Sequence, residues 1–169
     1  MLHLNEMPPT AAELQRYAPV HSRPMADTRV QLKVEDWIRR EWMPDQFGQK
    51  FFRERLKLNC GGVFDFDAVS ADETIAANIS TSGAKTAGGK HAVGKMLKVR
   101  SDVYFLLLAN VQRKLIILTE YDMYARWLKE KEAGRVPHEI EFFHAEIPTR
   151  LREALDESRL RASKEVRPK

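Results

Sequence analysis

Two aspartates, Asp65 and Asp67, are the residues of this sequence best placed to do chemistry. They lie in the segment 64–70, where apolar and polar residues alternate as in a β-strand. Side chains two residues apart on a strand share a face and stand about 6.6 Å apart. Both carboxylates could therefore approach one divalent cation, or a water bound to it, and Mg²⁺ prefers oxygen ligands of this kind. The alternative is that both aspartates only solvate the polar face of an antiparallel sheet.

A cluster of basic residues follows these aspartates along the chain. No acidic residue lies between Glu73 and Asp102, whereas five basic residues do: Lys85, Lys90, Lys95, Lys98 and Arg100. The whole chain has a formal charge of +4, so the rest of it is close to neutral. A local basic patch on a near-neutral chain is typical of an anion-binding surface, and a solvated lysine-rich helix face is the alternative.

The loop between residues 83 and 90 is rich in glycine and lies between a predicted strand and a predicted helix. It approaches a Walker phosphate loop, but His91 follows Gly89-Lys90 where Ser or Thr is required, and Ala84 replaces a glycine. Nucleotide hydrolysis is therefore disfavoured. A glycine-rich turn before a helix can still hold a phosphate, including one of a nucleic acid.

Three strands and two helices must position these residues. Alternation and turn residues predict strands over about 50–58, 63–70 and 74–81, arranged as an antiparallel meander. The helical period predicts one helix over 28–43, before the strands, and another over about 90–101, after them.

These elements must also bury an apolar face. We expect Phe64, Phe66 and Ala68 to share one face of the second strand, and Ile75, Ala77 and Ile79 one face of the third. The predicted contacts run from these strands to apolar residues of the second helix, namely Val93, Met96 and Leu97.

The remaining segments extend this α/β pattern. Dense Val, Leu and Ile predict buried strands over 103–109 and 114–119, followed by a helix over 121–133, a strand over 139–147 and a terminal helix after Pro148. Four of the eight prolines fall in residues 1–27, which predicts an extended N-terminal arm. Residues 28–169 have the length of a single α/β domain.

The order helix, three-stranded meander, helix, strand resembles the core of the restriction-endonuclease-like superfamily of PD-(D/E)xK nucleases. The resemblance covers roughly residues 30–109 and rests on the strands 64–70 and 75–82. It implies an α-β-β-β-α-β core with additional C-terminal strands and helices, and Mg²⁺-dependent hydrolysis of phosphodiesters. In that family an aspartate on the second strand is followed by Glu-x-Lys on the third.

Only one of the three family positions matches here. Asp67 matches the aspartate, while Asn78 and Ser80 stand where the glutamate and the lysine belong. Asn78 offers a neutral carbonyl to a cation, and Ser80 has no positive charge for the attacking water or the transition state. Asp65 could restore part of the lost charge, and Lys85, Lys90 or Lys95 could replace the lysine.

The predicted site residues follow from this comparison. The candidate metal ligands are Asp67, Asp65 and Asn78, and the candidate catalytic residues add Ser80 and Lys85. The candidate nucleic-acid-binding residues are Lys85, Lys90, Lys95, Lys98 and Arg100.

Three classes of function stay open. The first is a nuclease-like protein that acts on DNA with Mg²⁺ and a weakened or displaced site. The second is a non-catalytic nucleic-acid-binding module on the same fold, and the third is a protein-interaction domain whose basic face meets an acidic partner. A homodimer is an open alternative for the assembly.

Cysteine content and hydropathy bear on the compartment. The lone cysteine, Cys60, excludes an intrachain disulfide and suits a reducing environment. The longest apolar run has seven residues, from Val103 to Ala109, where a membrane-spanning helix needs about 20. We therefore expect a cytoplasmic protein without a membrane partner.

Overall fold

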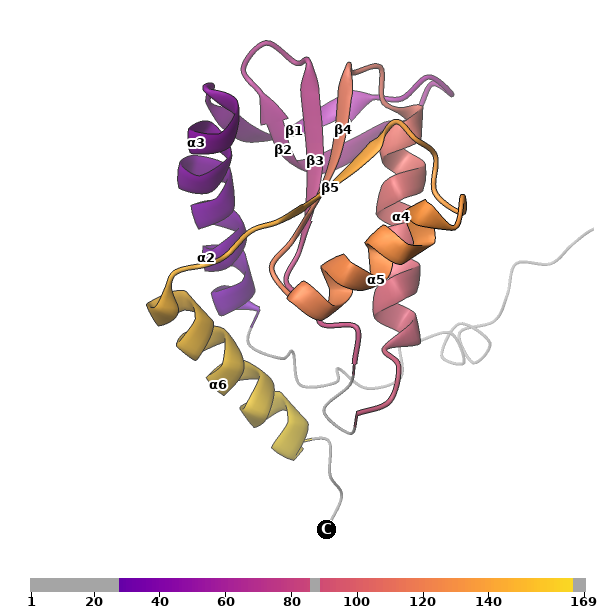
Figure 1. The fold of residues 1–169 in the computed structure, drawn as a ribbon. Coiled ribbons are helices and arrows are strands. Elements are labelled where there is room, and N and C mark those ends of the chain that lie inside the picture. Colours follow the sequence, from indigo (N-terminus) through magenta and orange to yellow (C-terminus); the bar gives the residue numbers. More distant parts are fainter. Residues whose placement is uncertain (1–27, 86–88, 166–169) are drawn as a thin grey trace, which may run out of the picture.

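The structure is a computed structural model that describes residues 28–85 and 89–165. It is a mixed α/β fold, and the predicted arm over residues 1–27 lies outside the described residues. In chain order the elements are α2 (Arg29–Trp37), the π-helical segment η1 (Ile38–Trp42), α3 (Met43–Phe47), β1 (Phe51–Lys57), β2 (Val63–Ser70), β3 (Ile75–Ser80), α4 (Val93–Leu108), β4 (Arg113–Leu118), α5 (Tyr121–Glu132), β5 (Ile140–His144) and α6 (Thr149–Glu165) (Figure 1).

The five strands form one sheet in the order β1-β2-β3-β4-β5. The first three strands pair antiparallel, which confirms the predicted meander and its boundaries to within a residue or two. Strands β3, β4 and β5 are parallel, with α4 and α5 as the crossovers that parallel pairing requires. The carboxyl ends of β3, β4 and β5 therefore lie at the same edge of the sheet.

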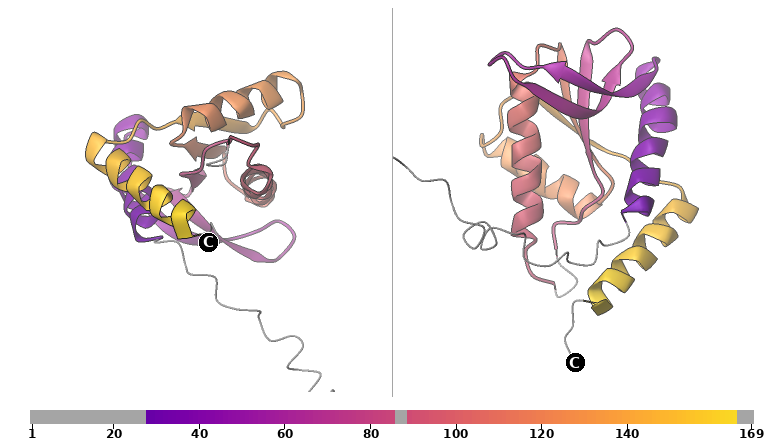
Figure 2. Two further views of the ribbon diagram at one scale, coloured as in Figure 1. Left: turned by 90° about the horizontal axis from the view of Figure 1, so that it is seen from below. Right: turned by 180° about the vertical axis from the view of Figure 1, so that it is seen from behind.

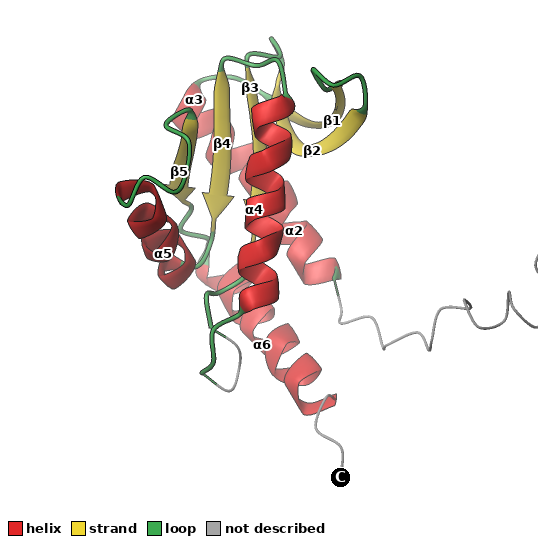
Figure 3. Ribbon diagram, turned by 90° about the vertical axis from the view of Figure 1, so that its right-hand side faces the viewer, coloured by secondary structure: helices red, strands yellow, loops and turns green. Residues whose placement is uncertain are grey.

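Helices cover both faces of the sheet. On one face, α2 and η1 contribute Val34 and Ile38 to a cluster with Ile75 and Ile79 of β3, and α6 lies beside α2 (Figure 2). On the other face, α4 and α5 pack over the sheet (Figure 3). Each residue of β3 is buried, since apolar neighbours stand on both sides.

The predicted packing partners of the strands are only partly right. Phe66 packs on the α4 side, in a cluster with Met96 as expected. Ile75 and Ile79 instead face α2, because β3 is covered on both sides and its alternate residues point to different helices. Val93 and Leu97 do not join the core and are 63% and 59% exposed.

The predicted strand over 103–109 is wrong, because these residues continue α4 as far as Leu108. Val99, Val103 and Leu106 are buried at spacings of four and three residues, the period of one helix face. A run of Val and Leu is therefore compatible with a buried helix as well as with a strand. The strand predicted over 114–119 is confirmed as β4, within one residue at each end.

An irregularity in β2 opens the sheet beside Asp67. Phe52 of β1 is paired with Val69 and Glu54 with Phe66, so β2 holds one residue more than β1 over this stretch, as in a β-bulge. Ala68 therefore lies in the α2-side cluster although Phe66 lies on the α4 side, and the predicted shared face of the two residues is wrong. The ladder between β2 and β3 covers only Ala68–Ala77 and Val69–Ala76.

Candidate functional site

Asp67 lies where β2 separates from β3, and its polar groups bind residues of both β3 and η1. Its carboxylate Oδ2 accepts a hydrogen bond from the backbone N–H of Ile79 at 2.8 Å. Its own N–H donates to Oδ1 of Asn78 at 3.4 Å. Its carbonyl accepts a hydrogen bond from the guanidinium of Arg39 at 2.6 Å. The structure thus brings Asp67 and Asn78 together, as the sequence predicts, and gives both side chains a structural task.

The carboxyl group of Glu35, on helix α2, also lies near Asp67, and the sequence did not predict it. Glu35 is half-buried, and burial raises the pKa of its carboxyl from 4.5 to about 7, with the charge of Asp67 adding to the rise. Lys98 and Arg39 act in the opposite direction. Nothing in the spacing of Glu35 distinguishes it from the other charges of the helix. Only the fold places it beside Asp67.

Asp65 does not join this group. Both of its carboxylate oxygens accept hydrogen bonds from the guanidinium of Arg53, at 3.2 and 3.0 Å, on the exposed part of the sheet. The hydrogen bond and the charge of Arg53 lower the pKa of Asp65. Asp65, on β2, forms a surface ion pair with Arg53 of β1. Its oxygens are therefore not directed to a cation shared with Asp67.

The residues present do not fit the predicted Mg²⁺ site of Asp67, Asp65 and Asn78. In the described ranges, no group of three or more His, Cys, Asp or Glu is arranged to hold a metal ion. Asn78 is 2% exposed, and its buried amide Nδ2 has no hydrogen-bond partner among the described residues. An N–H donor cannot ligate a cation, and the amide oxygen already accepts from Asp67.

Ser80, the last residue of β3, and Thr81, which follows it, line a pocket. Ser80 is 5% exposed, and its hydroxyl accepts a hydrogen bond from the N–H of Ser82 at 3.4 Å, which turns the chain out of the strand. Thr81 is 7% exposed and also lines the pocket. At the family's lysine position the chain therefore offers a buried hydroxyl rather than a charge.

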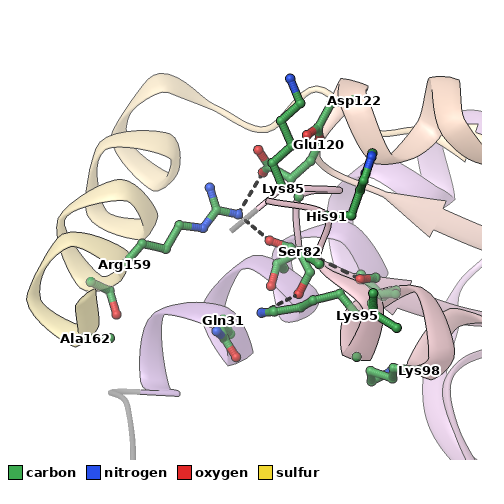
Figure 4. Close-up of a pocket in the computed structure, with 18 of the residues that line it drawn as sticks. Gln31, Ser82, Lys85, His91, Lys95, Lys98, Glu120, Asp122, Arg159 and Ala162 are labelled. Carbon is green, nitrogen blue, oxygen red and sulfur yellow. Dashed lines mark hydrogen bonds and ion pairs between the residues drawn. The ribbon is translucent and has the colours of Figure 1, made fainter. Parts of the chain in front are cut away.

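The pocket has a volume of about 1040 Å³ and lies at the carboxyl ends of β3 and β4 (Figure 4). Open α/β sheets bind their ligands at this edge of the strands. Residues from five parts of the chain line it: α2, the end of β3, the loop and first turns of α4, the start of α5, and α6. Glu35 lines the pocket as well, so the Asp67 site and the pocket are neighbours.

Two of the acidic residues that line the pocket, Glu120 and Asp122, bind internal partners. Glu120 accepts hydrogen bonds or ion pairs from Arg152 and Arg159 of α6, and Arg159 also donates to the carbonyl of Thr81. Burial opposes ionisation of Glu120, but the two arginines outweigh it and lower its pKa. Asp122 accepts a hydrogen bond from the N–H of Ala84 at 3.1 Å and holds the loop before α4.

The predicted basic residues divide into two groups. Lys85, Lys95 and Lys98 line the pocket. Lys95 donates to the hydroxyl of Ser82 at 3.1 Å, and Lys98 to the buried carboxylate of Asp102 at 2.7 Å. The side chains of Lys85 and Lys90 are exposed and bind no residue that the structure describes.

Arg100 belongs to the second group, the predicted basic residues that do not line this pocket. It faces α5, where it pairs with Glu130 at 3.5 Å and lies over the ring of Trp127. Three of the five predicted nucleic-acid-binding residues therefore share the pocket, whereas Arg100 is paired with α5.

Comparison with protein-family models, curated proteins and solved structures finds no match to this chain. Within residues 28–85 and 89–165, no helix combines the length and the apolar character that crossing a membrane demands.

Proposed function

We propose that the protein is a nuclease-like protein with a restriction-endonuclease-like core. We propose that it binds nucleic acid and that its main ligand is DNA. The order α2, β1, β2, β3, α4, β4 supports the core, because it is the α-β-β-β-α-β order that the resemblance implies. Asp67 and Asn78 lie together where β2 and β3 separate, with Ser80 two residues further along β3, which supports the same core.

The observation that carries the binding proposal is the pocket at the carboxyl ends of β3 and β4. Lys85 and Lys95 line it, and its acidic rim residues Glu120 and Asp122 already have internal partners. Glu35 also lines the pocket, but burial raises the pKa of its carboxyl to about 7, so the ammonium groups are the charged groups most available to an incoming ligand. Lysines at such an edge bind backbone phosphates, which position a nucleic acid without reading its sequence.

Binding without cleavage is favoured over cleavage because the residues do not fit the Mg²⁺ site. Hydrolysis with Mg²⁺ is the second candidate, and the specific observation in its favour is the pair of Glu35 and Asp67. Burial and the charge of Asp67 raise the pKa of Glu35 to about 7. A cation bound by both carboxyl groups would relieve the repulsion between them.

The test of binding is the salt dependence of DNA affinity, measured by fluorescence anisotropy on a labelled duplex. The variant carries Lys85→Ala, Lys90→Ala and Lys95→Ala, while Lys98 is retained because its loss would leave the buried Asp102 without a partner. Each phosphate contact adds about 0.9 to the slope of log affinity against log salt, so the slope should fall by up to about 3.

A charge-matched control removes three exposed cations from β1 and the turn before it, through Lys50→Ala, Arg55→Ala and Lys57→Ala. Its slope should stay close to that of the wild type. Equal slopes for the wild type and the Lys85/Lys90/Lys95 variant would reject the pocket as the phosphate site.

Plasmid nicking in Mg²⁺ and in Mn²⁺ separates the two candidate functions. Tight binding with no nicking supports the non-catalytic protein. Nicking that Asp67→Ala abolishes supports hydrolysis, whereas nicking that persists in Asp67→Ala rejects this site.

A further inference from the structure

A second groove lies between α4 and α5 and shares Lys85, His91, Val93 and Asp122 with the pocket at the carboxyl ends of β3 and β4. Its walls are residues at helical spacing: Val93, Met96, Leu97 and Arg100 from α4, and Asp122, Ala125, Arg126 and Lys129 from α5. In both sets the residues are spaced i, i+3, i+4 and i+7. One face of α4 therefore forms one wall of the groove, and one face of α5 forms the other. Its volume is about 400 Å³.

The floor and one edge of this groove are apolar and open to solvent. Val93 and Leu97 are 63% and 59% exposed, and Met96 is partly buried between them and the core. Tyr104, 59% exposed, stands eleven residues after Val93 and on the same side of α4. The stripe extends over about 16 Å of helix. Figure 3 shows α4 on the outside of the molecule with α5 beside it.

The rim of the groove is basic. Lys85, Arg100, Arg126 and Lys129 line it, against one acid, Asp122, which is bound to the N–H of Ala84. Arg100 and Arg126 both reach Glu130, at 3.5 and 3.6 Å, and Arg135 binds the same carboxylate at 2.8 Å. Three guanidinium groups share one carboxylate, which leaves N–H donors for further acceptors.

We propose that this groove binds an acidic amphipathic helix of a partner protein. Aliphatic side chains of that helix, repeated every three or four residues, cover Val93, Met96 and Leu97. Its Asp and Glu side chains meet Arg100, Arg126 and Lys129. Recognition of an amphipathic helix in an apolar groove uses this combination of spaced anchors and flanking charges.

Other occupants match the groove less well. A second copy of this chain seated here would bring two basic rims together, and like charges across an interface are costly. A nucleic acid would satisfy the arginines, but its phosphates would gain nothing from Val93 and Leu97. Exposed aliphatic residues of this size are typical of protein interfaces.

A labelled synthetic peptide tests the proposal against the full chain. The peptide is roughly 18 residues long, enough for several helical turns, with Leu at i, i+3, i+4 and i+7 positions and Glu between them. A scrambled peptide of equal composition controls for charge alone. Val93→Ser with Leu97→Ser removes the apolar stripe, and since both side chains are exposed the fold should tolerate the change.

The proposal expects fluorescence anisotropy to detect the ordered peptide at micromolar concentration, and both the scramble and the Val93/Leu97 variant to weaken binding by about tenfold or more. Lys129→Glu should weaken binding too, and replacing peptide Glu by Lys should then partly restore it. DNA affinity should stay unchanged in a Leu97→Ser variant, because Leu97 lines this groove and not the pocket at the carboxyl ends of β3 and β4. Equal binding of the two peptides, no binding up to about 100 μM, or loss of DNA affinity in that variant would overturn the proposal.

Discussion

Asn78 accepts a hydrogen bond from the backbone N–H of Asp67 at 3.4 Å, across the point where β2 and β3 separate. In the other direction, the carboxylate of Asp67 accepts from the N–H of the residue after Asn78, at 2.8 Å. Two side chains thus take over the pairing that the ladder stops providing after Ala68 and Ala77. At the position where the proposed nuclease-like core would place an acidic residue, this chain has an amide that holds the opened sheet together.

Substitution of Asn78 by Asp should create a cation site. The change keeps an oxygen for the N–H of Asp67, removes the unpartnered Nδ2 and adds a carboxyl group beside Asp67, whose charge also acts on Glu35. Without a cation the added charge should destabilise the fold at neutral pH. A divalent cation binds the folded state and stabilises it by about 2.7 kcal/mol at a concentration near a hundred times its Kd.

The measurement is Tm with and without Mn²⁺ or Mg²⁺, with the wild type as the control. The shift in Asn78→Asp should exceed that of the wild type by several degrees for a domain of this size. Equal shifts in the two proteins would show that the three groups cannot converge on one ion.

Asp65 and Asp67 should respond differently to removal of their charge. Asp65→Asn breaks an exposed ion pair with Arg53 and should cost at most about 1 kcal/mol. Asp67→Ala removes the acceptor for the N–H of Ile79 at a half-buried position and should cost about 1–3 kcal/mol. Urea denaturation of both variants checks the order. A larger loss for Asp65→Asn would contradict the assignment of Asp65 to the surface.

Much of the meander could be predicted from the sequence because its signals are local. Alternating polarity marks β2 and β3, and the turn residues 59–62 and 71–73 fix their ends. The bulge near Asp67 has no such signal, since the residues 64–68 alternate without a break. It depends on the pairing of β2 with β1, which is a tertiary property.

The candidate site was predictable only in part. The resemblance to the PD-(D/E)xK motif singled out Asp67, Asn78 and Ser80, and the structure brings Asp67 and Asn78 into hydrogen-bonding contact. Glu35 comes from a helix far away in the chain, and its spacing resembles that of any solvated helix charge. The end of α4 was mistaken for a strand because a helix buried on one side and a strand buried on both can share the same composition.

Glu120 should hold α6 in place over the pocket. Its hydrogen bonds from Arg152 and Arg159 lower its pKa. The Glu120 carboxylate therefore stabilises the fold at pH values above 4.5, the ordinary pKa of a glutamate. This stabilisation is lost as the pH falls through its lower folded-state pKa. Glu120→Gln should therefore cost about 1–2 kcal/mol at pH 7 and nothing once both states are protonated.

Hydrogen exchange gives the local measurement of the same effect. Amides of α6 should exchange faster in Glu120→Gln. Amides of α4 should keep their rates, because the two arginines that bind Glu120, Arg152 and Arg159, belong to α6. The control is Glu146→Gln, at an exposed glutamate between β5 and α6. Unchanged α6 exchange would show that the apolar contacts of the helix, such as the buried Leu155, suffice to hold it.

The last prediction concerns the pH dependence that Glu35 imposes on stability. Burial, with the charge of Asp67, raises its pKa from 4.5 to about 7, so the folded state retains a proton that the unfolded chain releases. Below pH 4.5 the carboxyl group is protonated in both states and costs nothing. Between pH 4.5 and 7 stability falls as the pH rises, and above 7 the full penalty is present. Glu35→Gln removes the charge with little change of shape and should stabilise the protein at pH 8 by about 2 kcal/mol after solvent screening.

Urea denaturation of both proteins from pH 4 to pH 8.5 should show the two stabilities converging at the acidic end. A difference that is constant across this range, or a wild type more stable at pH 8, would mean that the Glu35 carboxylate is stabilised by its cationic neighbours Lys98 and Arg39 more than burial and Asp67 disfavour it.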